Sequence, residues 1–351
     1  MARPTGPAIL LAPGSFKGTL SAGEVADALL AGFEHVGVRG DMCPLADGGD
    51  GTLDVLLGAV GGEQVGVEVH DALGRPIEAS YGVSADGQVA IVETAAAIGL
   101  GRLSESEHGP EAASSAGAGE LIAAAAQRAP AVLVGLGGSA SNDGGAGALA
   151  AIEAAGGLGG VPLTCLCDVA TPWELASETY GPQKGADSAA VERLAARLDA
   201  LAQELPRDPR GVPMTGAAGG VAGGLWAALG AELVPGASYV AGAVGFDARA
   251  ERAGAVVTGE GRLDETTLEG KVVAEVAARC RRLGIPLHAV VGADGSSEGV
   301  RSSLRLASVS EAGDADAIHD AAVAIARRHH TPTTERRIST PRAHKSDTRR
   351  D

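Results

Sequence analysis

The sequence is poor in aromatic residues, in basic residues and in long apolar runs. Of its 351 residues, three are Phe, three Tyr and two Trp, and 28 Lys and Arg stand against 44 Asp and Glu, a net charge of −16. Nucleic-acid binding needs cationic surface and aromatic stacking platforms, so we expect no nucleic-acid partner. The longest apolar stretches, such as residues 121–126, fall far short of a membrane span of about 20 residues. We therefore expect no membrane association.

Cysteine is also scarce. The four cysteines, at positions 43, 165, 167 and 280, form no Cys-x-x-Cys pair and have no histidine cluster beside them. Neither a zinc site nor a disulfide framework is expected from this spacing. The first apolar segment, residues 8–11, is too short for a signal peptide. These features predict a cytoplasmic protein.

Glycine is abundant, with 53 residues, about twice average usage. The glycines follow no three-residue period, and 45% of the chain is apolar, which excludes both collagen and a wholly disordered chain. The charge is uneven, because residues 327–351 hold eight basic and three acidic residues, which leaves −21 on residues 1–326. We expect residues 329–351 to form a disordered basic tail.

Short apolar runs alternate with alanine-rich helical patterns, which predicts an α/β fold. Ser21 and Glu24 form a capping-box pattern at the start of a helix over residues 21–33. Buried strands are predicted at 8–11, 131–135, 163–167, 255–258, 287–292 and 306–309. Segments 65–69, 77–83 and 88–93 instead predict an antiparallel meander, which indicates a second domain inserted into the first. The predicted outer domain is 1–64 with 283–328, and the insert is 65–282.

Glycine-rich loops follow several predicted strands. Residues 135–147 hold six glycines together with Ser139, Ser141, Asn142 and Asp143, and precede a helix, an arrangement that suits an oxyanion. The same loop comes within one residue of a nucleophile elbow, so a hydrolase that uses Ser139 remains an alternative. Asp47 and Asp50 in loop 46–52 suit Mg²⁺ or, equally, a turn that caps the helix over residues 53–57.

The remaining loops carry charged residues of both signs. Lys17, in the turn after the first strand, suits a phosphate, although a plain connection explains it as well. Arg262, in loop 256–264, suits a carboxylate or a phosphate, with a surface ion pair as the alternative. Asp168 follows a strand, where a general base could stand. Together the loops favour an anionic small substrate, a phosphoryl donor and Mg²⁺.

In their order and spacing these motifs resemble the bacterial two-domain glycerate kinases of the glycerate 2-kinase type. The resemblance covers residues 8 to about 326 and is carried by segments 12–17, 44–52, 93–100, 119–122, 135–147, 180–186, 216–220 and 258–264 with 270–272. It implies a flavodoxin-like (Rossmann-like) three-layer domain interrupted by a second mixed α/β domain, with the active-site cleft between them. It also implies the reaction of ATP with D-glycerate to ADP and phosphoglycerate, with 2-phosphoglycerate favoured and Mg²⁺ required. Oligomeric state is not predicted.

The resemblance also implies roles for individual residues. The expected catalytic residues are Asp168 as base, Lys17 on phosphate, Arg262 on the glycerate carboxylate, and Asp143. Asp47 and Asp50, with Asp143 as the alternative, are the expected metal ligands. Substrate or phosphate binding is expected of Ser15, Gly48, Gly49, Gly137, Gly138, Ser139, Ser141, Asn142, Lys184, Gly259, Glu260 and Asp264.

Three departures from the family pattern stand out. Gly14 replaces the usual Asp, the segment 154–163 is shortened, and Ala170-Thr171-Pro172 replaces the usual Thr-Asn-Pro. Two further interpretations therefore stay open: a kinase of another small hydroxy acid on the same fold, and a non-catalytic anion-binding protein that retains the loops.

Overall fold

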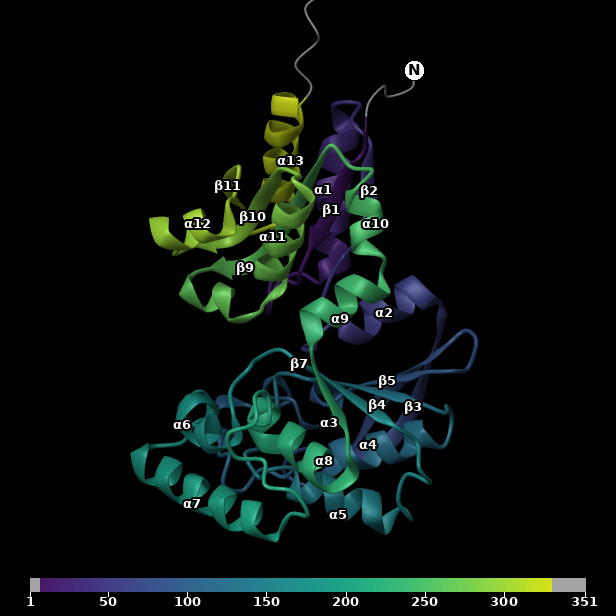
Figure 1. Cartoon of the computed structure of the whole chain (residues 1–351), viewed down its shortest axis with the longest axis vertical. Helices are drawn as coiled ribbons and strands as arrows, with labels where there is room; N and C mark the ends of the chain where they lie inside the picture. The colour runs from purple at the N-terminus through teal and green to yellow at the C-terminus, as the bar shows by residue number, and fades with distance from the viewer. Residues whose placement is uncertain (1–6, 330–351) are drawn as a thin grey trace, which may run out of the picture.

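The computed structural model describes residues 7–329, and their strands form two separate sheets (Figure 1). The first sheet is parallel throughout and has the order β11-β10-β9-β1-β2. Its strands are β1 (Ile9–Pro13), β2 (Gly40–Met42), β9 (Ala255–Leu263), β10 (Leu287–Asp294) and β11 (Ser308–Glu311). Counted along the chain, this order is 2-1-3-4-5 read from the β2 edge, which is the flavodoxin-like arrangement. The expected fold class is confirmed.

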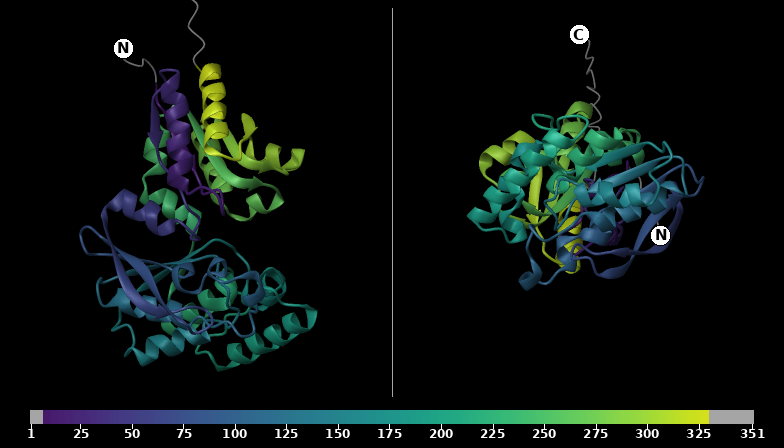
Figure 2. Two further views of the ribbon diagram at one scale, coloured as in Figure 1. Left: turned by 180° about the vertical axis from the view of Figure 1, so that it is seen from behind. Right: turned by 90° about the horizontal axis from the view of Figure 1, so that it is seen from below.

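Helices cover both faces of this first sheet. Helices α1 (Ala22–His35) and α13 (Ala315–His329) lie side by side on one face, where Phe33 and Ile318 are fully buried (Figure 2). The other face is covered by α10 (Phe246–Ala250), α11 (Val272–Leu283) and α12 (Glu298–Leu304). The capping box that begins α1 is confirmed, because the Glu24 amide donates to Ser21 Oγ at 3.2 Å and Glu24 Oε2 accepts from the Ser21 amide at 2.8 Å.

The second sheet is mixed and has six strands in chain order, from β3 to β8. Its strands are β3 (Gly62–His70), β4 (Pro76–Ser84), β5 (Ala90–Glu93), β6 (Val132–Leu136), β7 (Leu163–Cys167) and β8 (Glu232–Pro235). The meander from β3 to β5 is antiparallel as expected, and β5 to β8 are parallel to one another. An apolar core on one face is shared by α4 (Ala116–Ala126), α5 (Ala146–Ala154) and α8 (Val221–Leu229).

The two sheets share a continuous apolar core at the point where they meet. Helices α2 (Thr52–Val60) and α9 (Gly236–Ala243) lie between the sheets in Figure 1. One buried cluster joins Leu56 of α2 and Val240 of α9 to Leu10 of the first sheet and to Leu133 and Leu166 of the second. The connecting helices are therefore part of the core, and their packing fixes how the ends of one sheet face those of the other.

Sheet membership differs from the predicted domain boundary. The insert was expected to run to residue 282, yet β9 pairs in parallel with β1 from Ile9 to Pro13, and α11 packs on the same sheet. The chain therefore passes through α9 and α10 and rejoins the first sheet at Ala255, 28 residues before the expected position 283. The apolar run of β9 marks a buried strand, but it carries no information on which sheet the strand joins.

Two expectations concern the ends of the chain and membranes. The expected disordered tail, residues 329–351, lies outside the described residues except for His329, which ends α13. Among residues 7–329, no helix is long and apolar enough to cross a membrane.

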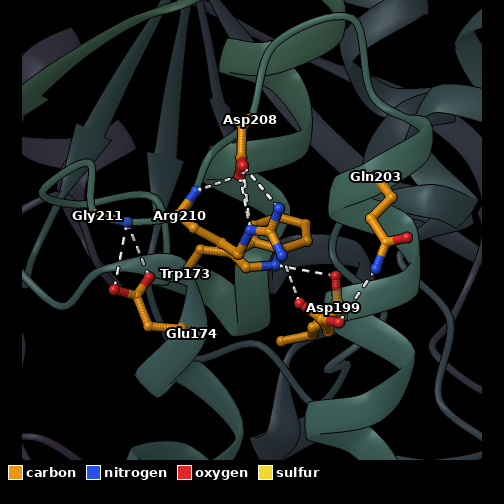
Figure 3. A network of polar contacts seen from close by, with 8 residues as sticks. Trp173, Glu174, Asp199, Gln203, Asp208, Arg210 and Gly211 are labelled. Atoms are coloured by element: carbon orange, nitrogen blue, oxygen red, sulfur yellow. Dashed lines mark hydrogen bonds and ion pairs between the residues drawn. The ribbon is translucent and has the colours of Figure 1, made fainter.

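A polar network fixes the segment after helix α7 (Ser188–Glu204) to the rest of the second sheet's helical layer (Figure 3). Arg210 forms ion pairs with Asp199 at 2.5 Å and with Asp208 at 2.7 Å, and the Gly211 amide donates to Glu174 Oε2 at 3.0 Å. Beside it, the fully buried Trp173 donates from Nε1 to the Leu198 carbonyl at 3.0 Å. The remaining short helices are α3 (Ala95–Ile98), α6 (Ala176–Tyr180) and the 3₁₀ turns η1 (Leu100–Arg102), η2 (Glu105–Glu107), η3 (Trp173–Leu175), η4 (Pro182–Lys184), η5 (Ala217–Gly220) and η6 (Glu265–Glu269).

We expect Trp173→Ala to lower the free energy of unfolding by about 3–5 kcal/mol, because the substitution leaves a cavity and removes the hydrogen bond from Nε1 to the Leu198 carbonyl. The matched control is Leu175→Ala in the same turn, since Leu175 is 44% exposed and its loss is expected to cost little. Urea unfolding followed by circular dichroism measures both. Equal midpoints for the two variants would contradict the role of Trp173 as an anchor.

Candidate active site

A large cavity lies at the carboxyl ends of the first sheet's strands. It has a volume of about 460 Å³ and is lined by the loops after β1, β9 and β10 and by loop 46–52. Strand order reverses between β1 and β9, and ligands of doubly wound sheets bind at such switch points. Of the predicted site residues, the cavity brings together Ser15, Lys17, Asp47, Asp50, Glu260, Arg262 and Asp264.

A second, smaller cavity of about 100 Å³ lies at the carboxyl ends of β6 and β7 in the second sheet. Its walls are built by the loop after β6, by Asp168, and by residues from α6, η4 and η5. Of the predicted site residues, it brings together Gly137, Gly138, Ser139, Asp168 and Lys184. The predicted residues thus form two groups, one at the end of each sheet.

The two groups adjoin because two glycine-rich loops touch through their backbones. A Cβ atom at Gly137 would lie 2.5 Å from the Gly49 Cα, a distance that real side chains do not reach. Gly48 has a φ of +98°, and a Cβ there would lie 2.5 Å from the carbonyl oxygen of Leu166. Gly48 and Gly49 line neither of these two cavities, so their predicted roles in ligand binding stay predictions, while Gly48 and Gly137 have a packing role. Their lack of side chains lets the loops of the two sheets meet.

Asp168 lines the small cavity, interacts with the charges of Asp47 and Lys17 in the large cavity, and has an altered proton affinity. Burial raises the pKa of Asp168 to about 7, and the charge of Asp47 acts in the same direction, whereas Lys17 and Lys184 oppose it. A carboxyl with a pKa near neutrality can accept a proton from a substrate at physiological pH. The environment is that of a general base.

Two lysines flank Asp168 in different surroundings. The charge of Asp47, followed by Asp168 and Asp50, raises the pKa of Lys17, so this exposed ammonium stays positive in the large cavity. Lys184 is only 3% exposed, and its Nζ donates to the Ser141 carbonyl at 2.6 Å. Burial lowers the pKa of Lys184 to about 8, against the opposing charges of Asp143 and Asp168.

Asp47 and Asp50 present oxygens that suit a magnesium ion. Asp47 Oδ1 accepts from the Gly49 amide at 3.1 Å, and among the described contacts its Oδ2 and both oxygens of Asp50 carry no hydrogen bond. Mg²⁺ is usually held by one or two carboxylates together with substrate phosphates. No group of three or more His, Cys, Asp or Glu side chains suited to a metal occurs within residues 7–329. The donor set fits Mg²⁺ delivered with a phosphate and not a fully protein-bound metal.

Arg262, Glu260 and Asp264 form the wall contributed by β9 and the turn after it. Arg262 Nε donates to Asp264 Oδ2 at 3.1 Å, and its side chain is 66% exposed, which leaves most of the guanidinium free for an anion. Asp264 also accepts from the amide and hydroxyl of Thr266 and caps η6. Burial raises the pKa of Glu260 to about 7, while the Thr267 hydroxyl donates to it at 2.6 Å.

Asp143 is held by backbone and hydroxyl donors, and its expected catalytic or metal-binding role stays a prediction. Its Oδ2 accepts from the Ser115 amide, the Ser115 hydroxyl and the Gly147 amide at 2.8, 2.9 and 3.2 Å, and its Oδ1 accepts from the Gly145 amide at 3.1 Å. Asp143 is 1% exposed and lines neither cavity. Because its oxygens are occupied by donors at the starts of α4 and α5, Asp143 holds the glycine-rich loop in place.

Three more predicted binding residues lie behind the cavity walls. Gly259 is buried within β9, where its carbonyl accepts from the Gly14 amide at 2.8 Å. Ser141 and Asn142 are fully buried, and Asn142 Nδ2 donates to Ser177 Oγ at 2.8 Å. None of these three residues lines either cavity, and their predicted role in ligand binding stays a prediction.

The hydrolase interpretation loses its basis. The Ser139 hydroxyl contacts the Ser141 hydroxyl at 3.0 Å, and no histidine lines the small cavity. A serine nucleophile needs an adjacent base. Ser139 instead remains a polar group on the cavity wall.

Several residues at the site were not assigned a role from the sequence. Lys271 lines the large cavity and donates to the Thr266 hydroxyl at 2.6 Å, and Gln183 lines the small one. Glu93, at the end of β5, accepts from the Leu53 amide at 2.7 Å and so caps α2 across the gap between the sheets; burial raises its pKa to about 7. Lys271, Gln183 and Glu93 all lie in the motifs described above, but which residues they contact is known only from the structure.

The three buried carboxyls Asp168, Glu260 and Glu93 make stability depend on pH. Each has a pKa of about 7 in the folded chain, above its ordinary value near 4. The native state then binds more protons than the unfolded state between these values, so the free energy of unfolding falls as pH rises from about 4 to about 7. Urea unfolding across this range measures the slope. Glu93→Gln should flatten it, whereas the exposed control Glu63→Gln should leave it unchanged; identical slopes would refute the assignment.

Comparison with known proteins places this geometry in a family. A model of the Glycerate kinase family matches residues 9–156 and 153–339. The glycerate 2-kinase of Escherichia coli is 36% identical over 322 residues, which cover 81% of this chain and 84% of that protein. The glycerate kinase of Halalkalibacterium halodurans is 35% identical over 325 residues, 82% of this chain and 86% of that protein.

A solved structure agrees with these sequence relatives. The structure from Salmonella typhimurium LT2 that carries the name glycerate kinase 2 is 32% identical, with a TM-score of 0.74 over 93% of this chain and 98% of that one. The match spans both sheets and the cleft between their carboxyl ends. The protein belongs to the glycerate kinase family.

Proposed function

We propose that the protein phosphorylates D-glycerate with ATP, with 2-phosphoglycerate as the favoured product. The observation that carries this proposal is the position of Asp168, whose carboxyl has a pKa of about 7 and lines the small cavity, while Asp47 and Lys17, which act on its charge, line the large one. Cationic side chains and carboxylates that suit a polyphosphate line the large cavity. Family membership supports the same activity.

In the proposed reaction Asp168 accepts the proton of the substrate hydroxyl. The hydroxyl oxygen then bonds to the γ-phosphorus of ATP, the bond from that phosphorus to the bridging oxygen breaks, and ADP leaves with the electron pair. The ammonium of Lys17, held positive by Asp47, lies where it can balance charge on the transferred phosphoryl group. The chain's own contribution is thus positioning, proton acceptance and charge neutralisation.

Asp47 and Asp50 are the proposed holders of Mg²⁺. Both line the large cavity with free carboxylate oxygens. When bound there with ATP, the ion supplies a positive charge that neutralises phosphate oxygens. We also place the reaction in the cytoplasm, because the four cysteines are buried and unpaired, as expected of a reducing compartment.

The proposed substrate is tested by following ADP release from MgATP with D-glycerate, L-glycerate, tartronate and glycolate in turn. We expect D-glycerate to give the highest kcat/KM. Nuclear magnetic resonance of the product then shows whether the phosphate is at carbon 2, as expected, or at carbon 3. A different preferred acid would replace glycerate by another hydroxy acid, and ATP binding without turnover of any acid would establish a non-catalytic anion-binding protein.

We expect Asp168→Asn to lower kcat by roughly 10²–10⁴-fold, the usual contribution of a general base, and to leave the Kd for ATP nearly unchanged. In the wild type the rate should rise as pH increases through about 7, because Asp168 must lose its proton to act. The variant should lack this rise. The control is Asp320→Asn, an 85% exposed residue on α13. Near-normal turnover by the Asp168 variant would remove Asp168 from the mechanism.

A further inference from the structure

The two adjoining cavities differ in volume by more than fourfold, about 460 Å³ against about 100 Å³. A cavity of 100 Å³ has room for about three water molecules at their share of liquid volume. That volume suits a three-carbon acid better than a nucleotide. The large cavity falls within the range of sites that hold cofactors and nucleotides. The two volumes therefore match the two substrates of a kinase, a nucleotide in the large cavity and a small acid in the small one.

We propose that the small cavity is the hydroxy-acid subsite, in which the substrate carboxylate pairs with Lys184, and that the large cavity holds the nucleotide triphosphate. This assignment rests on the proposed function. It makes Lys184 and Gln183 determinants of acid specificity. It also moves Arg262 from the glycerate carboxylate, its expected partner, to the phosphates.

Lys184 is the main support for the acid subsite. Its ammonium is 3% exposed and forms no ion pair within 4 Å with any carboxylate of residues 7–329. One hydrogen bond, to the Ser141 carbonyl, leaves two of its three donor positions unused. A buried charge without a partner is costly, and a substrate carboxylate in the cavity that Lys184 lines would provide the partner.

The other polar groups of the small cavity suit the hydroxyls of such an acid. Ser139 and Gln183 line it, and both can donate or accept hydrogen bonds. Behind Gly219, which also lines the cavity, the fully buried Asn142 Oδ1 has no hydrogen-bond partner among the described contacts; a Cβ atom at Gly219 would lie 3.0 Å from it. This region therefore contains a hydrogen-bond acceptor that no donor of the described chain satisfies.

The large cavity has the charge pattern of a polyphosphate site. Lys17, Arg262 and Lys271 line it from three different segments, and Asp47 and Asp50 face the same space. Its position at the switch point between β1 and β9 is where doubly wound sheets bind nucleotides. Arg262 is 66% exposed and belongs to this cavity alone, so it is placed for phosphate oxygens and not for a carboxylate bound in the small cavity.

Asp168 fixes the direction of transfer between the subsites. It lines the small cavity, while its closest electrostatic partners, Asp47 and Lys17, line the large one. An acid hydroxyl beside Asp168 would lose its proton to that carboxylate and face the phosphates. The γ-phosphoryl group would then pass from the large cavity to the small one, and ADP would leave from the large one.

The experiment compares two variants at opposite sides of the junction in the full-length protein. Gln183 is exposed, and Gln183→Glu adds a like charge to the acid subsite with little change in shape; Gln183→Met is its uncharged control. Lys271→Gln removes a cation from the large cavity. Initial rates give KM for D-glycerate and for ATP, and calorimetry gives the Kd for ATP without any acid present.

We expect Gln183→Glu to raise KM for D-glycerate by at least about tenfold, because like charges in contact cost more than 1.4 kcal/mol, with KM and Kd for ATP within about twofold. Gln183→Met should show a smaller rise. Lys271→Gln should raise KM and Kd for ATP and leave KM for D-glycerate unchanged. A four-carbon hydroxy acid should react with a kcat/KM at least about 100-fold below that of D-glycerate.

The assignment would be overturned if Gln183→Glu raised KM for ATP and Lys271→Gln raised KM for D-glycerate. Equal kcat/KM values for three- and four-carbon acids would also overturn it. Absence of turnover in the wild type is a different result, because it contradicts the proposed function. In that case the Kd for ATP still tests whether the large cavity binds the nucleotide. Loss of ATP affinity in Lys271→Gln alone supports this assignment, and loss of ATP affinity in Gln183→Glu alone overturns it.

Discussion

The site depends on one steric constraint, the contact between the backbones of two loops that belong to different sheets. Gly137 lies so close to the backbone of Gly49 that a Cβ atom at Gly137 would be 2.5 Å from the Gly49 Cα. Because the loops meet, Asp47 from the first sheet and Asp168 from the second act on each other's charge. Every electrostatic feature of the cleft follows from that approach, and the shared core around α2 and α9 holds it in place.

The cleft works against the overall charge of the chain. The protein carries −16, and such a field repels ATP and glycerate. The cations of the cleft oppose that field locally, and the carboxylates around Lys17 keep it protonated. Binding of anions is therefore a property of a few cations and backbone amides within short range, which suggests that affinity varies less with ionic strength than steering by a basic surface does.

The sequence was most informative where structure is decided locally. The capping box at Ser21, the meander from β3 to β5 and the buried parallel strands follow from turn residues and apolar patterns, and all are present. The sheet that β9 joins depends instead on contact with β1, some 245 residues earlier. For the same reason the sequence could not distinguish the roles of Asp143 and Asp168. The Asp143 carboxylate accepts hydrogen bonds from Ser115 and from its own loop, whereas the Asp168 carboxyl interacts with the charges of Lys17 and Lys184.

The placement of tryptophan has a spectroscopic consequence. Trp173 and Trp226 both lie in the part of the chain that forms the second sheet and its helices, and residues 7–61 and 236–329 contain none. Trp173 is fully buried and packs against Gly144 and Gly220, which lie next to the glycine-rich loop and η5. Intrinsic tryptophan fluorescence therefore reports only on the half of the molecule that carries Asp168. The half that carries Lys17 has no tryptophan, so a tryptophan placed there would let each half be followed by itself.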